Sequence, residues 1–310
     1  MCGFFLQVNR EVSLELSRER TNLIESRLSN RGSDSTNSLY LKDRTFNYFI
    51  NHSRLIISGD KENGKQPMYD SNYILLFNGQ IYNYQELSTK HKINDTGSDT
   101  KFLFELLKKN DFNYCIQLLR GPFAIIFINL NKNNIYIARD IFGESPLFFR
   151  EAKNNLIISS DYSLLNHNNG NSLAKNRVNE VINQGFQFSN EYSTSVVEPG
   201  KIIAFKFSLK ENKFLTTEFN SNLRKVLINR NIKKKIFYIA KKNIINKFVD
   251  TLIKSIDEET NDFDKYGLLL STGIDSNLLY QCLKRMNKKC TKYSVCTSSE
   301  NAFLDNVDMI

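Results

Sequence analysis

The first residues of the chain combine a nucleophile with a base. Cys2 lies between the initiator Met1 and Gly3, and we expect Met1 to be removed. Cys2 would then carry a thiol and a free α-amino group, whose reference pKa of about 8 lets it take the thiol proton directly or through one water. A cysteine is also a common small buried residue, so the rest of the chain must decide between these two interpretations.

The composition is that of a globular protein in a reducing compartment. The 310 residues suffice for one large or two medium domains, and 41% hydrophobic residues with 23 Phe supply a core. No apolar run is long enough to span a membrane, and residues 1–10 lack the features of a signal peptide. The cysteines are scattered and form no CxxC pair: Cys2, Cys115, Cys282, Cys290 and Cys296. We therefore expect no disulfide, no metal site and a cytoplasmic location.

The net charge of +9 admits a nucleic-acid interpretation, which the distribution of the charge does not favour. The densest basic run, 233–235, precedes a helix-like stretch with further lysines. No RNA-binding sheet motif and no aromatic-interleaved basic groove accompanies the run. A solvated helix face explains it better, so we expect neither nucleic acid nor membrane as a partner. His52, His91 and His167 lack ligand spacing, and we assign them no function.

The first part of the chain alternates short apolar stretches with polar turns, which is typical of antiparallel sheets. We predict three hairpins across short polar turns, at 123–138, 147–159 and 202–217. We predict further strands at 3–8, 49–58 and 73–77, and helices at 14–28 and 100–109. Antiparallel sheets covered by helices predict an α+β layered domain that ends near residue 220.

A different pattern begins after a polar stretch at 220–232. Apolar residues three and four apart predict a helix from Ile236 onward. Next come a short apolar run at 266–270, the loop Ser271-Thr272-Gly273-Ile274-Asp275-Ser276, a helix at 277–286 and another strand at 291–295. A strand, a hydroxyl-rich loop and a helix in this order point backbone N–H groups and a helix N-terminus at a phosphate.

Short motifs occur in a fixed order along the first two thirds of the chain. They are Cys2-Gly3, Arg31-Gly32-Ser33-Asp34, Arg54-Leu55-Ile56-Ile57, Gln66-Pro67-Met68, Asn78-Gly79-Gln80-Ile81-Tyr82-Asn83, Thr96-Gly97-Ser98-Asp99, Arg120-Gly121-Pro122-Phe123-Ala124, Ala138-Arg139-Asp140 with Gly143, and Ser145-Pro146-Leu147-Phe148-Phe149. Their order and spacing resemble the class II (N-terminal nucleophile) glutamine amidotransferase domain of asparagine synthetases. The loosened motifs resemble the divergent branch of asparagine synthetase domain-containing proteins. The resemblance implies a four-layer αββα N-terminal nucleophile hydrolase domain over residues 2–220.

The resemblance also implies the residues that perform glutamine hydrolysis. Cys2 corresponds to the nucleophile that attacks the side-chain amide of glutamine. The side chain of Asn78 and the backbone N–H of Gly79 correspond to the oxyanion hole. Loss of one such donor typically lowers a rate by roughly 10²- to 10³-fold, so both positions would be essential.

Three further residues correspond to the positions that bind glutamine. Arg54 matches the residue that grips the α-carboxylate, for which a guanidinium is suited, and Asp99 matches the residue that holds the α-ammonium. Gln80 stands where the family has Glu, which removes one charge near the ammonium. Taken singly, Arg54 could face solvent, and Asp99 or Ser98 could be the N-cap of the following helix. Within the ordered set we favour substrate binding.

After a linker at 221–235, residues 236–310 resemble the start of the family's α/β ATP pyrophosphatase domain, whose usual loop is Ser-Gly-Gly-x-Asp-Ser. The resemblance implies ATP and Mg²⁺ as cofactors, with Asp275 near the metal ion. The implied ATP-binding residues are Ser271, Thr272, Gly273, Asp275 and Ser276.

Thr272 stands where the family has Gly, and a β-branched residue is unfavourable there if φ is positive. Residues 265–310 supply fewer strand–helix units than a doubly wound nucleotide domain needs, so we expect an incomplete synthetase domain that makes no asparagine by itself.

The resemblance therefore implies a glutamine-hydrolysing, asparagine synthetase-like enzyme. It would hydrolyse glutamine to glutamate and ammonia, and the ammonia would serve the ATP-dependent conversion of aspartate to asparagine. The alternative is a catalytically weak or inactive relative that acts as a binding or assembly module. Loss of Cys2, Asn78 or Arg54 would favour that alternative, and all three are present. The sequence does not indicate an oligomeric state.

Overall fold

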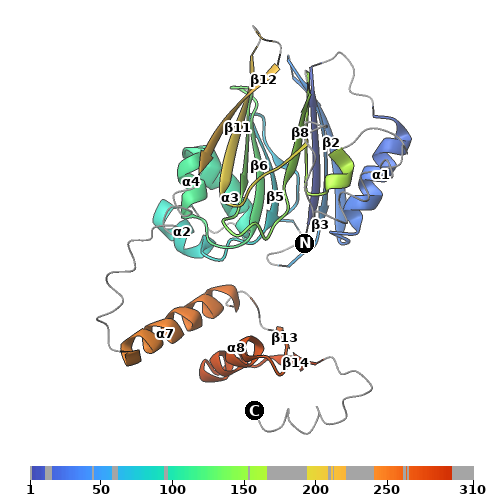
Figure 1. The fold of residues 1–310 in the computed structure, drawn as a ribbon. Helices are drawn as coiled ribbons and strands as arrows, with labels where there is room; N and C mark the ends of the chain where they lie inside the picture. The colour runs from blue at the N-terminus through green and yellow to red at the C-terminus, as the bar shows by residue number, and fades with distance from the viewer. Residues whose placement is uncertain are drawn as a thin grey trace, which may run out of the picture. The chain divides into compact units, whose positions relative to one another are not determined.

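The computed structural model describes residues 2–10, 16–43, 45–57, 62–93, 97–152, 154–165, 194–208, 211, 213–220, 241–260, 263 and 265–294. The chain divides into two compact units, residues 1–228 and 229–310, and each is described by itself. The first unit contains both large sheets and the helices that cover them (Figure 1).

One six-stranded antiparallel sheet is built around the N-terminal strand β1 (Gly3–Asn9). On one side β1 pairs with β3 (Asn47–Arg54), with Gly3 opposite Ser53, and on the other side it pairs with β9 (Asn155–Ser159). The remaining strands are β2 (Ser35–Lys42), β8 (Phe148–Ala152) and β10 (Thr194–Val196). The strand order β10-β8-β9-β1-β3-β2 places the start of β1 beside the end of β3.

A second six-stranded antiparallel sheet has the order β12-β11-β7-β6-β5-β4. Its strands are β4 (Met68–Tyr69), β5 (Tyr73–Gly79), β6 (Phe123–Asn129), β7 (Asn134–Arg139), β11 (Lys201–Ser208) and β12 (Lys213–Asn220). The edge strand β4 pairs only with Ile74 and Leu75. The last residues of β5 therefore have no described strand beside them on that side.

The two sheets pack face to face over an apolar core, in which Phe4, Leu6 and Val8 of β1 are fully buried. Because side chains alternate along a strand, Phe5 points to the opposite, outer face of its sheet. Helix α1 (Arg18–Ser29) covers that outer face and packs on Phe5 and Phe49.

Among the described residues, three helices cover the outer face of the second sheet (Figure 1). They are α2 (Tyr84–His91), α3 (Asp99–Lys109) and α4 (Phe112–Leu118). Buried apolar side chains of α3 and α4 form one cluster with residues of β5 and β6. The predicted four-layer αββα arrangement is confirmed.

Several predicted elements are confirmed with changed ends. All three predicted hairpins form: β6 pairs with β7, β8 with β9, and β11 with β12. Helix α1 begins at Arg18 rather than at residue 14, because the Ser17 hydroxyl accepts a hydrogen bond from the backbone N–H of Arg20 and caps the helix. β3 ends at Arg54 rather than at residue 58.

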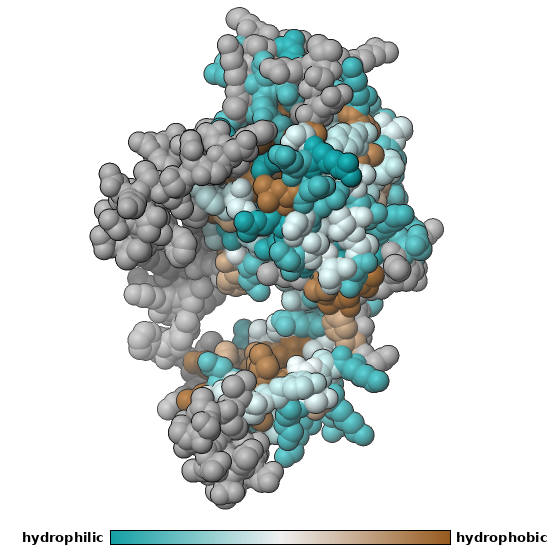
Figure 2. All heavy atoms as spheres, turned by 90° about the vertical axis from the view of Figure 1, so that its right-hand side faces the viewer, coloured by the Kyte–Doolittle hydropathy of each residue, from teal (hydrophilic) through white to brown (hydrophobic). Residues whose placement is uncertain are grey.

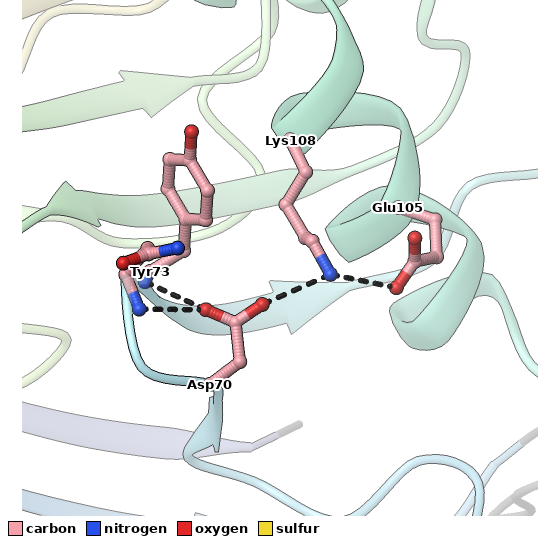
Figure 3. Close-up of polar contacts among 5 residues, drawn as sticks. Asp70, Tyr73, Glu105 and Lys108 are labelled. Carbon is pink, nitrogen blue, oxygen red and sulfur yellow. Dashed lines mark hydrogen bonds and ion pairs between the residues drawn. The ribbon is translucent and has the colours of Figure 1, made fainter.

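The turn between β4 and β5 is tied to α3 by a small ionic cluster (Figure 3). One oxygen of Asp70 accepts hydrogen bonds from the backbone N–H groups of Asn72 and Tyr73, each at 2.9 Å. The other oxygen lies 2.9 Å from Nζ of Lys108, which also contacts Glu105 at 3.2 Å. These side chains are partly exposed, so the ion pairs contribute little energy. Their geometric effect is to join the start of β5 to the last turn of α3.

Exposed hydrophobic residues of the first unit are spread over several of its described elements. On the face in Figure 2, hydrophobic residues form separate spots among hydrophilic ones. Scattered exposed apolar residues, such as Leu23 on α1 and Tyr40 on β2, are normal for a globular protein. Within the described residues, no helix is long and apolar enough to cross a membrane.

The described part of the second unit is a short α/β segment. It contains α7 (Lys241–Thr260), β13 (Gly267–Leu269), α8 (Ile274–Arg285) and β14 (Thr291–Tyr293). β13 and β14 pair in parallel, and β14 corresponds to the strand predicted at 291–295. Ile256 of α7 packs with Cys282 and Leu283 of α8 in a small core. The predicted linker at 221–235, including the basic run, lies outside the described residues.

Candidate active site

One pocket of the first unit is lined by all six residues predicted for glutamine hydrolysis and glutamine binding: Cys2, Arg54, Asn78, Gly79, Gln80 and Asp99. The two sheets supply different parts. Cys2 precedes β1 and Arg54 ends β3, which are neighbours in the first sheet. Asn78 and Gly79 end β5 in the second sheet. The pocket thus lies where the two sheets meet at one end of the core.

The thiol of Cys2 rests on the backbone of Leu55. Its Sγ accepts from the Leu55 N–H at 3.4 Å and lies 3.6 Å from the Leu55 carbonyl oxygen. Burial raises the pKa of the Cys2 thiol, and the Leu55 contact and the charge of Arg54 oppose that rise. Arg31 holds the Cys2 carbonyl oxygen through Nε at 3.2 Å. Met1 lies outside the described residues, so its removal stays a prediction.

Asn78 is buried in the pocket without polar partners. Its side chain is 1% exposed, and neither Oδ1 nor Nδ2 has a hydrogen-bond partner within the described residues. Buried amides are normally hydrogen-bonded, so such a group calls for an explanation. A donor that faces a pocket and has no partner in the protein can bind a developing negative charge on a ligand.

Gly79 is required next to Asn78 for two reasons. Its φ of 150° lies in a region that residues with a side chain rarely adopt. A Cβ at this position would also collide with the carbonyl oxygen of Pro122. The glycine therefore lets β5 end close to the start of β6, where its backbone borders the pocket.

Arg54 is 5% exposed although it carries a charge, so the interpretation that it faces solvent is wrong. Its guanidinium lies against Gly64, where a Cβ would collide with Nη2. Gly64 does not have a positive φ. Glycine is therefore favoured here because a larger side chain would not fit beside the guanidinium, and not because of the backbone conformation. The guanidinium packs in the pocket wall, in a place that a side chain at residue 64 would fill.

Asp99 begins α3 but does not cap it. The N-cap is Ser98, whose hydroxyl accepts from the Lys101 N–H at 3.1 Å. The Asp99 carboxylate accepts from the backbone N–H of Ile81 at 3.1 Å and of Thr100 at 2.7 Å. Burial raises the pKa of Asp99 to about 6, although these hydrogen bonds and Arg54 oppose the rise. Asp99 is thus a buried carboxylate at the pocket, beside the loop that follows Gly79.

The structure adds pocket residues to which the sequence analysis gave no role, among them Gln66, Glu144 and Ser145. Glu144 and Ser145 lie in the loop after β7, and Asp140 organises this loop. The Asp140 carboxylate accepts from the backbone N–H groups of Phe142, Glu144 and Ser145 at 3.0 to 3.1 Å. The sequence feature that could have indicated this loop is the turn-like stretch Gly143-Glu144-Ser145-Pro146, which follows shortly after β7.

Arg139 completes the support of this loop. Its guanidinium donates to the carbonyl oxygens of Gly143 at 2.6 Å, Ser145 at 2.7 Å and Val197 at 2.8 Å. Arg139 and Asp140 therefore both act on backbone groups. Through them the loop after β7 is fixed at the pocket and also joined to the chain next to β10.

The loop at 271–276 in the second unit connects β13 to α8. The hydroxyls of Ser271 and Ser276 lie 3.0 Å apart, and the Gly273 N–H donates to the Ser271 hydroxyl at 3.2 Å. Gly273 caps α8 without a side-chain hydrogen bond, so the first N–H groups of this helix are not satisfied by a capping side chain. Thr272 does not adopt a positive φ. The predicted steric problem with a β-branched residue therefore does not arise from the backbone conformation.

No metal cluster is found in the part of the chain that the structure describes, where no three His, Cys, Asp or Glu side chains converge. The four described cysteines, Cys2, Cys115, Cys282 and Cys290, are free thiols.

Comparison with known proteins identifies similar sequences for both units. Residues 1–215 match the family model described as "Glutamine amidotransferase domain". Asparagine synthetase [glutamine-hydrolyzing] 1 of Bacillus subtilis (strain 168) is 28% identical over 95% of this chain and 46% of its own length. Asparagine synthetase [glutamine-hydrolyzing] of Brassica oleracea is 30% identical over 48% of this chain and 25% of its own length. The chain thus spans about half or less of the length of these relatives.

Among solved structures, glutamine phosphoribosylpyrophosphate amidotransferase from B. subtilis, complexed with ADP and GMP, aligns with a TM-score of 0.49. It is 16% identical in sequence, and the alignment covers 71% of this chain and 50% of that chain.

Proposed function

Because the chain belongs to the family of glutamine amidotransferase domains, we propose that its first unit hydrolyses the side-chain amide of glutamine to glutamate and ammonia. The observation that carries this proposal is the convergence of Cys2, Asn78, Gly79, Arg54 and Asp99 on one pocket. These residues come from separate segments, and together they supply a nucleophile, donors for an oxyanion and two opposite charges.

The reaction begins at the Cys2 thiol. After removal of Met1, the α-amino group of Cys2 takes the thiol proton, and the thiolate attacks the carbonyl carbon of the glutamine amide. The Asn78 side-chain N–H and the Gly79 backbone N–H stabilise the tetrahedral oxyanion. The protonated amine gives its proton to the leaving nitrogen, ammonia departs, and water then hydrolyses the thioester to release glutamate.

Substrate recognition uses the two charged ends of the amino acid. Arg54 binds the α-carboxylate, and Asp99 binds the α-ammonium together with the polar side chain of Gln80. The raised pKa of Asp99 supports this assignment, because a ligand cation would compensate for the burial of the carboxylate. Clefts with strongly perturbed carboxylates are frequent functional sites.

The ammonia serves an asparagine synthetase-type reaction in which ATP drives the conversion of aspartate to asparagine. The similarity to glutamine-hydrolysing asparagine synthetases over most of this chain supports this proposal. The segment around residues 271–276 is the start of the ATP-using domain. The hydroxyls of Ser271 and Ser276 and the N–H groups at the start of α8 bind the ATP phosphates, with Thr272 and Gly273 in the same loop, and Asp275 helps to place Mg²⁺.

The glutaminase proposal is tested by release of glutamate and ammonia from glutamine by the purified chain, with Cys2→Ala as the control. Activity in the parent protein that is absent in Cys2→Ala supports it. Binding of glutamine without any release would favour the non-catalytic binding module instead. The ATP proposal is tested by calorimetric titration with Mg-ATP, in which Ser276→Ala should weaken binding and Thr251→Ala on α7 should not.

A further inference from the structure

The last residues of β5 are held by a side chain that the reaction above does not use. The Oε1 of Gln66 accepts from the Phe77 N–H at 2.6 Å, and its Nε2 donates to the Phe77 carbonyl oxygen at 3.0 Å. Gln66 is 2% exposed. Because β4 pairs only as far as Leu75, this amide takes the place of a neighbouring strand at Phe77. Without it the Phe77 N–H would lose this hydrogen bond, which is unfavourable for a buried backbone group, and the Phe77 carbonyl oxygen would lose one of its donors.

His52 reaches the same carbonyl oxygen from the other sheet. Its Nε2 lies 3.2 Å from the oxygen of Phe77, and the ring is completely buried. Burial lowers the pKa of His52 to about 4, so the ring is neutral near neutral pH. A carbonyl oxygen only accepts, so Nε2 carries the proton of the neutral ring. The contact connects β3 of the first sheet to β5 of the second.

Asn78 depends on this support because its own side chain has none. Neither of its polar side-chain atoms has a partner in the described part of the protein. The orientation of the Asn78 side chain is therefore set by the backbone of β5, in which Phe77 directly precedes Asn78. His52 lies two positions before Arg54 on β3. The contact of His52 with Phe77 therefore also links the strand that carries Arg54 to the strand that carries Asn78.

We propose that Gln66 and His52 are positioning residues for the oxyanion hole, which fix Phe77 and thereby hold the Asn78 amide in place opposite Cys2. The proposal rests on the proposed glutaminase function. It predicts that changes at these two positions act on the chemical step through Asn78, although neither residue touches the reacting atoms. Displacement of a reacting group by about 1 Å can lower a rate roughly 100-fold, which sets the scale of the expected effect.

The first test is the kinetics of Gln66→Met, which keeps the volume of the side chain and removes both hydrogen bonds. We expect kcat for glutamine to fall by roughly 10- to 100-fold with KM changed less than about twofold. In an Asn78→Ala background the same substitution should have almost no further effect, because the two residues act as a unit. Gln7→Met is the matched control, since Gln7 is also buried but lies on β1 and does not line the pocket.

A second pair of variants tests the contact of His52. His52→Gln keeps an N–H donor at a reach similar to Nε2 and should retain most of kcat. His52→Leu removes the donor and should lower kcat without raising KM. If both variants lose activity equally, or if Gln66→Met raises KM instead of lowering kcat, the proposal is wrong.

A measurement independent of turnover separates this proposal from the proposed function. The side-chain amide signals of Asn78 in ¹H–¹⁵N NMR spectra are identified by their absence in Asn78→Ala. They should shift or broaden in Gln66→Met and in His52→Leu, and stay unchanged in Gln7→Met. Unchanged Asn78 signals in the first two variants would overturn the proposal. A parent protein without glutaminase activity would overturn the proposed function, while the NMR comparison would still decide this inference.

Discussion

The Sγ atom of Cys2 lies 3.4 Å from the backbone nitrogen of Leu55, the residue directly after Arg54. The proposed nucleophile is therefore held beside the strand end that carries Arg54, although the two residues are far apart in the chain. The antiparallel pairing of β1 with β3, with Gly3 opposite Ser53, produces this arrangement. Both side chains line the same pocket, as the proposed reaction requires.

The first prediction concerns covalent labelling of the nucleophile. An electrophilic glutamine analogue should add once per chain, on Cys2, and the mature protein should lack Met1. Cys115 is an internal control, since it is fully buried and burial raises its pKa to about 12. Intact mass spectrometry followed by peptide mapping checks both points. An adduct elsewhere with Cys2 unmodified, or retention of Met1, would contradict the mechanism.

The second prediction concerns the binding of the α-carboxylate. Arg54→Ala should raise KM for glutamine by roughly 10- to 100-fold, because a charged hydrogen-bond partner is lost. Gly64→Ala should also raise KM, since the new Cβ would displace the Arg54 guanidinium without changing any charge. Gly273→Ala, where a Cβ meets only the Ser271 hydroxyl, is the control. An unchanged KM in Arg54→Ala would mean that the carboxylate binds elsewhere.

The third prediction concerns the oxyanion. Asn78→Ala should lower kcat by roughly 10²- to 10³-fold and leave KM nearly unchanged, because its donor acts mainly on the transition state. Asn78→Asp should be at least as harmful, since it replaces the donor by a negative charge. Steady-state kinetics with melting temperatures measured in parallel separates this effect from unfolding. Equal small changes in kcat and KM would show that Asn78 has been assigned wrongly.

The fourth prediction is a dependence on pH. Asp99 has a pKa of about 6 in the folded protein, and only its ionised form attracts the substrate ammonium. Therefore kcat/KM for glutamine should rise as the pH increases through about 6, with a further rise at higher pH as the α-amino group of Cys2 loses its proton and can act as the base. In Asp99→Asn the rise near pH 6 should disappear, and KM should be high at all pH values. A rise that persists in Asp99→Asn would assign it to another group.

The same pKa shift has the opposite effect on stability. The pKa of Asp99 is raised above its unfolded value, so this group stabilises the fold below the unfolded pKa, and that contribution is lost as the pH rises through about 6. Asp99→Asn should therefore increase the melting temperature at neutral pH relative to the parent protein, and less so in acid. Thermal melts of both proteins across this range provide the check. An Asp99→Asn protein that melts lower than the parent at neutral pH would mean that hydrogen bonding at this position outweighs desolvation.

Much of the fold could be predicted from residue patterns alone. β6 and β7 were recognisable because each is an apolar stretch next to a short polar turn, and the structure pairs them directly. β2 was missed, since it is a half-exposed edge strand rich in Ser, Thr and Asn without a clear apolar face. α2 and α4 were also missed, because each is only about two turns long, which is too short for a helical repeat of apolar residues to be recognised.

Residues of the candidate pocket were predictable only where their type at a motif position indicated a role. Cys2, Arg54 and Asp99 belong to this group, and the structure brings them to one pocket. The contact of Gln66 with Phe77 was not predictable, because it depends on β4 beginning at Met68, opposite Leu75, which leaves Phe77 without a neighbouring strand. His52 was given no role for a similar reason, since its partner lies on a strand of the other sheet.

The pocket takes its proposed nucleophile from one sheet and its proposed oxyanion donors from the other, so the distance between them depends on the thickness of the core between the sheets. Stacked sheets lie about 10 Å apart, and interiors packed at crystal-like density transmit changes in volume. Truncation of a fully buried side chain such as Ile126 or Phe205 would let the sheets approach each other. Such a protein could remain folded while the nucleophile and the Asn78 amide no longer match the size of a glutamine side chain. Apolar core residues that do not contact the substrate would thereby set the distance between Cys2 and the Asn78 amide.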